Sequence, residues 1–337
     1  MSGSDTVGIG FIGCGAYNAG LASAAVRSEK LKCVGCFDVR PEQSAGFAER
    51  FGMQAYASIE ALAEDKNIAG VVIASPNNAH RQNIEAALAG GKHIFVDKPI
   101  ANTIEDALAI IQMTSDAGRV LSVGHNGRRN AGHRKMKEMI RQGAIGDPIC
   151  VEANFSHSGG LGLTPEQWRF YRDECPGLPL MQLGVHFADT VQYLLGEVKE
   201  VASFMSHVAT PADNVDNTVT LLKFEGGLLG YLGSNYASPS VYYVNIYGTG
   251  GNLHCEGGGN LLYRKADTTE KVLVELVGTD PQLEELEEFA DAILGRVAVE
   301  VDGYQALRAL AIVQGAIRSS ETGQPVSLDE LIAGATS

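Results

Sequence analysis

The sequence predicts an α/β protein in which a doubly wound parallel sheet is followed by a separate α+β domain. Two observations carry this prediction. Short apolar runs alternate with helical periods from Val7 to Val123, which is typical of a parallel sheet covered by helices on both faces. From Val198 to Val274 this alternation gives way to strands joined by short turns, among them Glu225-Gly226-Gly227.

The elements of the first part follow from apolar runs and their end signals. Pro41 lies in the first turn of a helix that Gly52 ends, and Ser58 caps the next helix. Pro99 cannot donate to a sheet ladder, so the strand before it ends at Lys98. The expected strands are Val7–Ile12, Leu31–Phe37, a short one from Tyr56, Gly70–Ala74, the run ending at Lys98, and Val120–Val123. The expected helices are one ending near Arg27, Pro41–Phe51, Ile59–Glu64, Asn77–Leu88, and one from Thr103 to about Ala117.

The first strand-to-helix turn carries the chemistry of a dinucleotide site. Gly13 permits a tight turn, Gly15 lets the backbone approach a pyrophosphate, and the helix N-terminus supplies amide donors. Asp38 ends the next strand, the usual place of the acid that binds the adenosine ribose. A glycine turn without a ligand is the competing interpretation, and the flanking strand, the helix and Asp38 together argue against it. The cofactor-binding residues predicted in this region are Gly13, Gly15, Ala16, Tyr17, Asn18 (where a third glycine is usual), Asp38 and Arg40.

The predicted cofactor is NAD. The Asp38 carboxylate would repel the 2′-phosphate of NADP. Arg40 keeps NADP open as the alternative, because a guanidinium can bind a 2′-phosphate or simply stack on adenine. No metal site is predicted.

Residues 180–195 are predicted to form an amphipathic helix with a polar stripe. Gln182, His186, Asp189 and Tyr193 share one face, and an apolar face runs separately along the segment. A solvent-facing stripe would more often carry Lys and Glu. The loop before it, residues 158–179, holds Trp168 beside Arg169; this tryptophan either plugs the core or flanks an active site.

The chain resembles the Gfo/Idh/MocA oxidoreductases, the family of glucose–fructose oxidoreductase and inositol dehydrogenase. The resemblance covers essentially the whole length and rests on Gly13-Cys14-Gly15, Asp38, Ala74–His80, Asp97-Lys98-Pro99, Gly124-His125-Asn126 with Arg128-Arg129, and Leu183–Asp189. It implies a Rossmann domain over residues 1–125 and an α+β domain over 126–302 for substrate binding and oligomerisation. It further implies that this second domain has a large, mostly antiparallel open sheet, and that a C-terminal helix in 303–337 packs back on the first domain.

The resemblance also implies a set of site residues. Lys98 and His186 are the expected catalytic pair. The nicotinamide side is expected to contain Ser75, Pro76, Asn77, His80, Asp97, Lys98 and Pro99, although His80 taken by itself suits a solvated helix turn. The expected substrate-binding residues are Gln182, Asp189, Asn126, Trp168 and Arg169.

Gln182 departs from the family pattern, which commonly has an aspartate there. A glutamine cannot ionise, so it cannot raise the basicity of His186 by its charge. Asp189, three residues beyond His186, could orient the imidazole instead.

The predicted function is hydride transfer between NAD(P) and a secondary hydroxyl or ketone of a sugar or cyclic polyol. His186 is the expected base, and Lys98 is expected to stabilise the developing alkoxide. The departure at Gln182 keeps an aromatic cis-dihydrodiol open as the substrate. Two alternative functions remain from other classes: an NAD-assisted glycoside-cleaving enzyme and a cofactor-sensing binding protein.

Composition narrows the partners. A formal net charge of −14 argues against nucleic acid or an anionic membrane as partner. The sequence predicts a cytoplasmic protein, because it has no apolar run long enough for a signal peptide or membrane span and its six scattered cysteines suit reduced thiols. Strands apolar on both faces, such as 241–247, predict a homodimer or homotetramer formed through the C-terminal sheet. Glu284, Glu285, Glu287 and Glu288 are expected to form a solvated face of the helix Gln282–Leu294.

Overall fold

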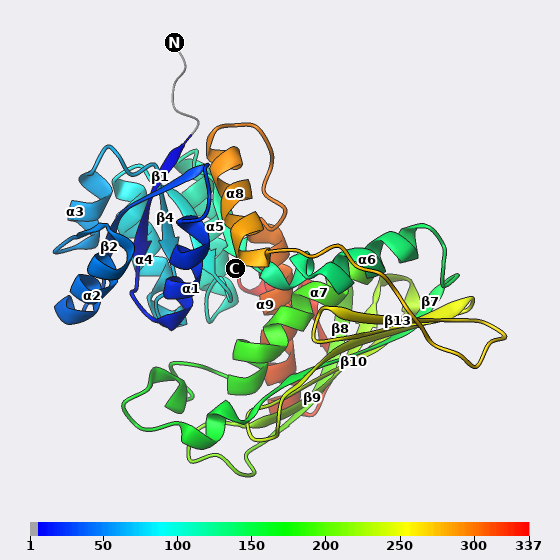
Figure 1. Cartoon of the computed structure of the whole chain (residues 1–337). Coiled ribbons are helices and arrows are strands. Elements are labelled where there is room, and N and C mark those ends of the chain that lie inside the picture. Colours follow the sequence, from blue (N-terminus) through cyan, green and yellow to red (C-terminus); the bar gives the residue numbers. More distant parts are fainter. Residues whose placement is uncertain (1–5, 337) are drawn as a thin grey trace. The chain divides into compact units, whose positions relative to one another are not determined.

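The computed structural model describes residues 6–336, and these divide into two compact units. The first unit contains residues up to 101, 105–125 and 280–306; the second contains 102–104, 126–279 and the residues from 307 onward. This division differs from the predicted one, which placed residues up to 302 in the second domain. Figure 1 shows the whole chain with its elements labelled.

The first unit is built on a six-stranded sheet in the order β3-β2-β1-β4-β5-β6, with every neighbouring pair parallel. This is the strand order of a dinucleotide-binding doubly wound sheet, as predicted. Its elements are β1 (Val7–Ile12), α1 (Ala16–Ala25), β2 (Leu31–Phe37), α2 (Pro41–Phe51), β3 (Gln54–Ala55), α3 (Ile59–Glu64), β4 (Gly70–Ile73), α4 (His80–Ala89), β5 (His93–Asp97), α5 (Ile104–Asp116), β6 (Leu121–Gly124) and α8 (Pro281–Ile293).

Local signals set the ends of several of these elements. Pro41 is the first residue of α2, and Gly52 closes the helix in the left-handed conformation. The Ser58 hydroxyl accepts a hydrogen bond from the Ala61 amide at 3.1 Å, which caps α3. The helix expected from Asn77 begins as a single 3₁₀ turn, Asn77–Ala79, before α4.

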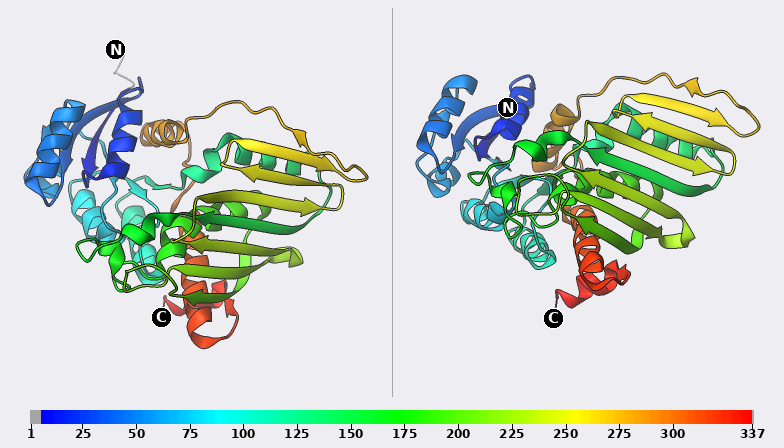
Figure 2. Two further views of the ribbon diagram at one scale, coloured as in Figure 1. Left: turned by 60° about the horizontal axis from the view of Figure 1, so that its bottom comes forward. Right: turned by 90° about the horizontal axis from the view of Figure 1, so that it is seen from below.

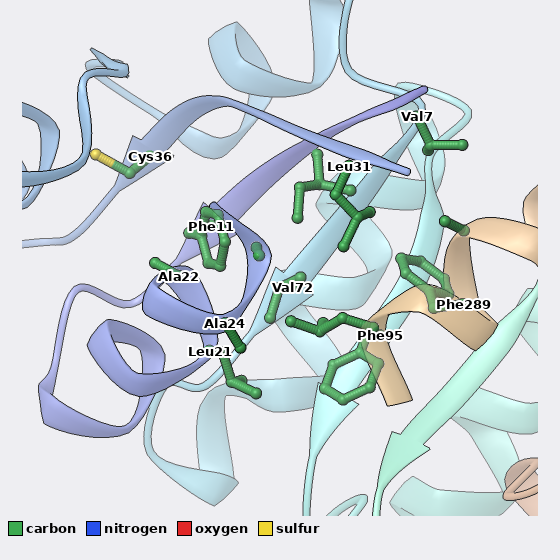
Figure 3. Packing of buried hydrophobic residues seen from close by; sticks show 14 of the residues in the cluster. Val7, Phe11, Leu21, Ala22, Ala24, Leu31, Cys36, Val72, Phe95 and Phe289 are labelled. Carbon is green, nitrogen blue, oxygen red and sulfur yellow. The ribbon is translucent and has the colours of Figure 1, made fainter. Parts of the chain in front are cut away.

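The helix α8 completes the core of the first unit, which is why it groups with that unit. It lies beside α1, and Figure 1 draws α8 in orange and α1 in blue. The Phe289 ring packs edge-on against Phe95 of β5 at 5.9 Å, and both rings are fully buried (Figure 3). Gly70 makes room for this packing, since a Cβ there would lie 2.9 Å from the Phe289 ring.

The second unit is built on a nine-stranded sheet in the order β14-β13-β12-β11-β7-β10-β9-β8-β15. Only β7 and β10 form a parallel pair in it, so the predicted mostly antiparallel sheet is confirmed. Figure 2 shows these strands side by side. The elements are α6 (Ala131–Arg141), β7 (Pro148–Ser156), α7 (Val185–Leu195), β8 (Val198–Ser206), β9 (Asn217–Phe224), β10 (Leu229–Asn235), β11 (Val241–Gly248), β12 (Gly251–Glu256), β13 (Asn260–Lys265), β14 (Val272–Leu273), α9 (Gly303–Thr322), β15 (Val326–Ser327) and α10 (Leu328–Gly334).

The C-terminal helix α9 groups with the second unit from Leu307 onward; its predicted packing against the first domain stays a prediction. It lies along β8, whose outer edge pairs with only two residues of β15. The hydroxyls of Ser319 and Ser320 accept the amide hydrogens of Ser203 and Met205, each at 3.0 Å. These serines satisfy an otherwise open strand edge, which explains the placement of the helix.

Two findings bear on the expectations from composition. Across residues 6–336, every helix is too short or too polar to cross a membrane. All six cysteines are free thiols, as predicted.

Candidate functional site

The turn between β1 and α1 has the form that a pyrophosphate requires. Gly13 has a φ of +87°, and a Cβ there would lie 2.9 Å from the Ala74 carbonyl oxygen of the neighbouring strand segment. A Cβ at Gly15 would meet no atom within 4 Å, so the space above the turn is open. Gly15 is the N-cap of α1 and no side chain caps the helix, which leaves its first amides available to an anion.

Asp38 lies directly after β2, beside this turn. Its Oδ2 accepts the Cys14 amide hydrogen at 2.8 Å, and its Oδ1 accepts that of Arg40 at 2.9 Å. A carboxylate offers about four acceptor positions, so lone pairs remain for ribose hydroxyls. The Arg40 side chain is largely exposed, and its Nε lies 3.5 Å from Asp38 Oδ1.

A cavity of about 350 Å³ adjoins the turn, lined by Cys14, Gly15 and Ala16 together with residues of α2 such as Phe47 and Arg50. The pKa of the Cys14 thiol is raised, chiefly by its contact with Cys36 and further by burial. The thiol therefore stays neutral beside the place for the pyrophosphate. The open helix terminus, the cavity and Asp38 together fit a dinucleotide.

Asn18 and Tyr17 were predicted to bind cofactor, and both have partners within the protein. Asn18 is fully buried, and its Nδ2 donates to the carbonyl oxygens of Ile12 (3.1 Å) and Gly13. These hydrogen bonds hold the turn in place. The usual third glycine at this position would instead let the helix pack more closely against the strand. Burial, then the charges of Asp97 and Glu285, raise the pKa of the Tyr17 hydroxyl. Glu285 is itself buried, so the expectation that it is solvated is wrong.

Lys98 follows the last residue of β5, and its side chain is 9% exposed. The peptide bond between Lys98 and Pro99 is cis. Its low exposure places the Lys98 ammonium group in a nearly buried position at the carboxyl end of β5, an inner strand of the sheet. This is the end of an open α/β sheet at which ligands bind.

His80 is buried against the same segment rather than solvated. Its Nδ1 lies 3.1 Å from the Pro99 carbonyl oxygen, and its Nε2 lies 3.1 Å from that of Ser75. Burial lowers the pKa of His80, and the backbone carbonyls oppose this shift. The ring thus ties the segment after β4 to the Lys98–Pro99 segment, which makes His80 a positioning residue. Ser75 is further held by Asn83, whose Nδ2 donates to the Ser75 hydroxyl at 2.8 Å.

In the second unit, the polar stripe begins in a π-helical turn. Residues Leu180–Gly184 form this turn, and α7 continues from Val185. A π turn is rare and often marks a functional position in a helix. The π turn contains Gln182, which is buried. His186 follows two residues after the turn and is half-buried, with its ring 5.6 Å from that of Phe155.

Asp189 forms an ion pair with Arg128, a partner that the sequence analysis did not anticipate. Arg128 donates to both of its carboxylate oxygens, from Nε at 2.7 Å and from Nη2 at 2.6 Å, and the two side chains are 8% and 1% exposed. The guanidinium also lies over the Tyr193 ring, 5.4 Å from its centre. The Asp189 carboxylate is therefore held in a buried ion pair with Arg128, and a role in binding substrate or orienting His186 stays a prediction. Asn126 opens the 3₁₀ turn that carries Arg128 and is half-buried.

Arg169 contacts both Trp168 and Gln182, and all three residues were predicted to bind substrate. Arg169 Nε donates to Gln182 Oε1 at 3.0 Å, and its guanidinium lies 4.6 Å from the centre of the Trp168 ring. The Gln182 amide nitrogen donates to Cys175 Sγ at 3.4 Å. Trp168 is half-buried in a 3₁₀ turn and supports a cation, so it is not a plug of the core.

His157 and Tyr236 adjoin this group and were missed by the sequence analysis. Their rings are 4.7 Å apart, and the Arg169 charge affects the pKa of each residue. They follow β7 and β10, the parallel pair, so both stand at the same edge of the sheet. The sequence feature that could have pointed to them is a polar aromatic residue directly after a strand, which occurs at both positions.

Known protein families match both parts of the chain. Residues 7–125 match the model of the GFO/IDH/MocA oxidoreductase family with a NAD-binding Rossmann fold, and residues 133–254 match the GFO/IDH/MocA C-terminal domain. The chain is 27% identical to 1,5-anhydro-D-fructose reductase of Ensifer adhaerens, covering 95% of this chain and 98% of that protein. It is 25% identical to myo-inositol 2-dehydrogenase of Thermotoga maritima, covering 96% and 99%.

Among solved structures, an oxidoreductase from Desulfitobacterium hafniense is 36% identical with a TM-score of 0.94, covering 97% of this chain and 99% of that one. The two family models together cover the greater part of the chain, and so does the likeness to this structure. The chain therefore belongs to the GFO/IDH/MocA family of oxidoreductases, with a NAD-binding Rossmann domain in its first unit.

Proposed function

We propose that this protein transfers a hydride between a nicotinamide cofactor and a secondary hydroxyl or ketone of a sugar or cyclic polyol. The observation that carries the proposal is the nearly buried Lys98 at the end of β5, in a sheet whose first turn fits a dinucleotide. The names of two relatives, an anhydrofructose reductase and an inositol dehydrogenase, support a substrate of this class.

We assign His186 and Lys98 to the reacting oxygen. An imidazole can accept a proton and donate it again, so His186 takes the hydroxyl proton during oxidation and returns it during reduction. The Lys98 ammonium stabilises negative charge on that oxygen, and its low exposure strengthens this effect. The bound nicotinamide supplies the hydride acceptor. Gln182 gives His186 no countercharge, which leaves Lys98 as the main electrostatic contributor.

For the cofactor, we propose NAD over NADP. The Asp38 carboxylate is held by two backbone amides and is only 8% exposed, so it is fixed beside the turn. A 2′-phosphate would bring at least one further negative charge next to it. Arg40 is the group that would have to compensate, and it is mobile enough in solvent to make only a weak pair.

Lys98→Ala and His186→Ala test the catalytic assignments. Reduced-cofactor absorbance with a panel of sugars, polyols and cis-dihydrodiols gives the rates. We expect kcat to fall about 10²- to 10³-fold for Lys98→Ala and about 10²- to 10⁴-fold for His186→Ala. Cofactor affinity, measured by calorimetric titration, should change little, and Lys32→Ala at an exposed position of β2 is the matched control.

Near-wild-type rates in both variants would contradict the catalytic assignments. Rates that remain zero in the unmodified protein with both cofactors would contradict the proposed function itself. A cofactor that copurifies and is not consumed while a glycoside is cleaved would redirect the proposal to redox-assisted cleavage.

We further propose that two copies associate through the open face of the nine-stranded sheet. Phe204 of β8 is 80% exposed and stands opposite Val219, and Leu221 and Leu229 are also exposed on neighbouring strands. The other face of these strands is buried, with Thr220, Leu222 and Phe224 turned to the interior. An exposed sheet face with these apolar side chains suits a second copy of the same sheet.

A further inference from the structure

Within residues 6–336, Arg169 is a fixed cation without an acidic partner. Its Nε donates to Gln182 and its guanidinium stacks on Trp168, while its terminal nitrogens make no hydrogen bond and no ion pair in this part of the chain. A half-buried guanidinium normally has an acidic partner, because burial removes part of its hydration. None of the acidic side chains in residues 6–336 forms an ion pair with Arg169.

Gln182 explains how the cation is held without being neutralised. A guanidinium only donates, so the amide oxygen must face Arg169, and the amide nitrogen donates to Cys175 Sγ. An aspartate or glutamate at this position would cancel the charge. The glutamine instead fixes the orientation of the guanidinium and leaves the charge available to a ligand.

A second group nearby also lacks a partner. Tyr236 is 8% exposed, and its hydroxyl makes no hydrogen bond to the described part of the chain. Burial raises the pKa of this hydroxyl and the Arg169 charge opposes the shift, so the phenol is a neutral donor close to the guanidinium. His157 Nε2, in the ring packed against Tyr236, is likewise without a hydrogen bond in residues 6–336.

We propose that the substrate carries a carboxylate, and that Arg169 and Tyr236 bind it. The inference rests on the proposed function and names its substrate class: an acidic sugar or a cyclic polyol acid. The planar fork of a guanidinium matches a carboxylate with two parallel hydrogen bonds, and a phenol adds a third donor.

The charge balance favours a carboxylate over a phosphate. Burial, together with Arg169, lowers the pKa of His157, so His157 is neutral and the group holds a single positive charge. A carboxylate carries one negative charge, whereas a phosphate monoester carries about 1.5 to 2 at neutral pH. The single positive charge of Arg169 therefore balances the charge of a carboxylate but only part of the charge of a phosphate.

The fluorescence of Trp168 tests binding independently of turnover. It is the single tryptophan of the chain, and it lies against the Arg169 guanidinium. The full-length protein with NAD is titrated with galacturonate, glucuronate and quinate, and with their neutral counterparts galactose, glucose and myo-inositol; glucose 6-phosphate is the phosphate probe. We expect at least one carboxylated ligand to give a saturable change about 10- to 100-fold tighter than its neutral counterpart.

Arg169→Gln should abolish that preference, and Arg172→Gln, an exposed arginine on the same loop, should keep it. Tyr236→Phe should weaken carboxylate binding by a smaller factor, which separates the phenol from the charge. Equal binding of neutral and carboxylated ligands, no response to any carboxylate, or a preference retained in Arg169→Gln would overturn the inference. A response to glucose 6-phosphate alone would overturn the carboxylate assignment and indicate a phosphate as the group that Arg169 binds.

Turnover distinguishes this inference from the function on which it rests. If carboxylated ligands bind through Arg169 but none reduces NAD or NADP, the hydride-transfer proposal fails and the binding assignment stands. If neutral sugars are oxidised as fast as their acids and Arg169→Gln leaves the rates unchanged, the dehydrogenase stands and the carboxylate is rejected.

Discussion

Replacing Asp189 by asparagine should destabilise the second unit without changing the chemistry of the site. The substitution removes the charge that Arg128 contacts at 2.6 and 2.7 Å, in a pair with side chains 8% and 1% exposed. Asparagine can accept one of the two hydrogen bonds, but its amide hydrogens face a donor and the buried guanidinium loses the charge of Asp189. Breaking such a pair from one side costs about 3–5 kcal/mol.

For a unit of this size, that free energy corresponds to a melting temperature lowered by roughly 10 °C. Differential scanning calorimetry measures the shift. Glu200→Gln is the matched control, because it removes one side of the exposed Lys223–Glu200 pair, worth about 0–1 kcal/mol. In the double variant Arg128→Met with Asp189→Leu, most of the stability should return, since a buried pair replaced by apolar side chains leaves no uncompensated charge.

Activity measured well below the melting temperature separates the two roles considered for Asp189. As a structural partner of Arg128, it should leave kcat nearly unchanged in both variants. If Asp189→Asn melts like the unmodified protein and loses kcat by two orders of magnitude, Asp189 serves His186 and the reasoning from the ion pair is refuted.

Three further predictions concern pH, cofactor choice and assembly. The buried imidazole of His133, whose Nδ1 donates to the Gly127 carbonyl oxygen at 2.6 Å, has its pKa lowered to about 4, chiefly by burial. Above pH 6.5 it is neutral in both folded and unfolded chains; as pH falls from 6.5 toward 4 only the unfolded chain gains the proton, so about 3 kcal/mol of stability is lost. Urea unfolding at pH 7 and 4.5 should show a smaller difference for His133→Gln, and an equal one would contradict the assignment. Asp38→Ser should raise the Michaelis constant for NAD about tenfold or more and raise that for NADP less; an unchanged ratio of the two would argue against ribose binding by Asp38. Leu221→Lys should shift the protein toward monomers in light scattering, because it places a charge on the exposed face of β9, whereas Lys199→Gln should not; a monomeric unmodified protein would refute the association.

Features determined within a few residues were predictable from the sequence. The Ser58 cap, the Pro41 start and the Gly52 end of α2 each depend on a backbone conformation or hydrogen bond formed inside one helical turn. The glycine turn belongs to the same group, because Gly13 needs its positive φ whatever the rest of the chain does. The parallel sheet of the first unit was predictable from repeated strand–helix units with short connections.

Features that depend on distant partners were not predictable in the same way. The helical period correctly placed Asp189 on the polar face, but its partner Arg128 comes from 61 residues earlier in the chain. His80 looked solvated from its own helix turn, yet carbonyls 19 and 20 residues away surround its ring. The π turn before α7 also left no sequence signal, since a helical pattern does not distinguish the two windings over one turn.

The placement of α8 has a consequence for how the protein is made. The hydrophobic core of the first unit is incomplete until Phe289 and Leu286 leave the ribosome, although its sheet ends at Gly124. At a synthesis rate of about 5–20 residues per second, the unfinished sheet waits roughly 10–30 seconds with the Phe95 surface uncovered. During that interval it is a candidate for chaperone binding, and a nascent chain arrested before residue 281 should be captured more strongly than one released after residue 306.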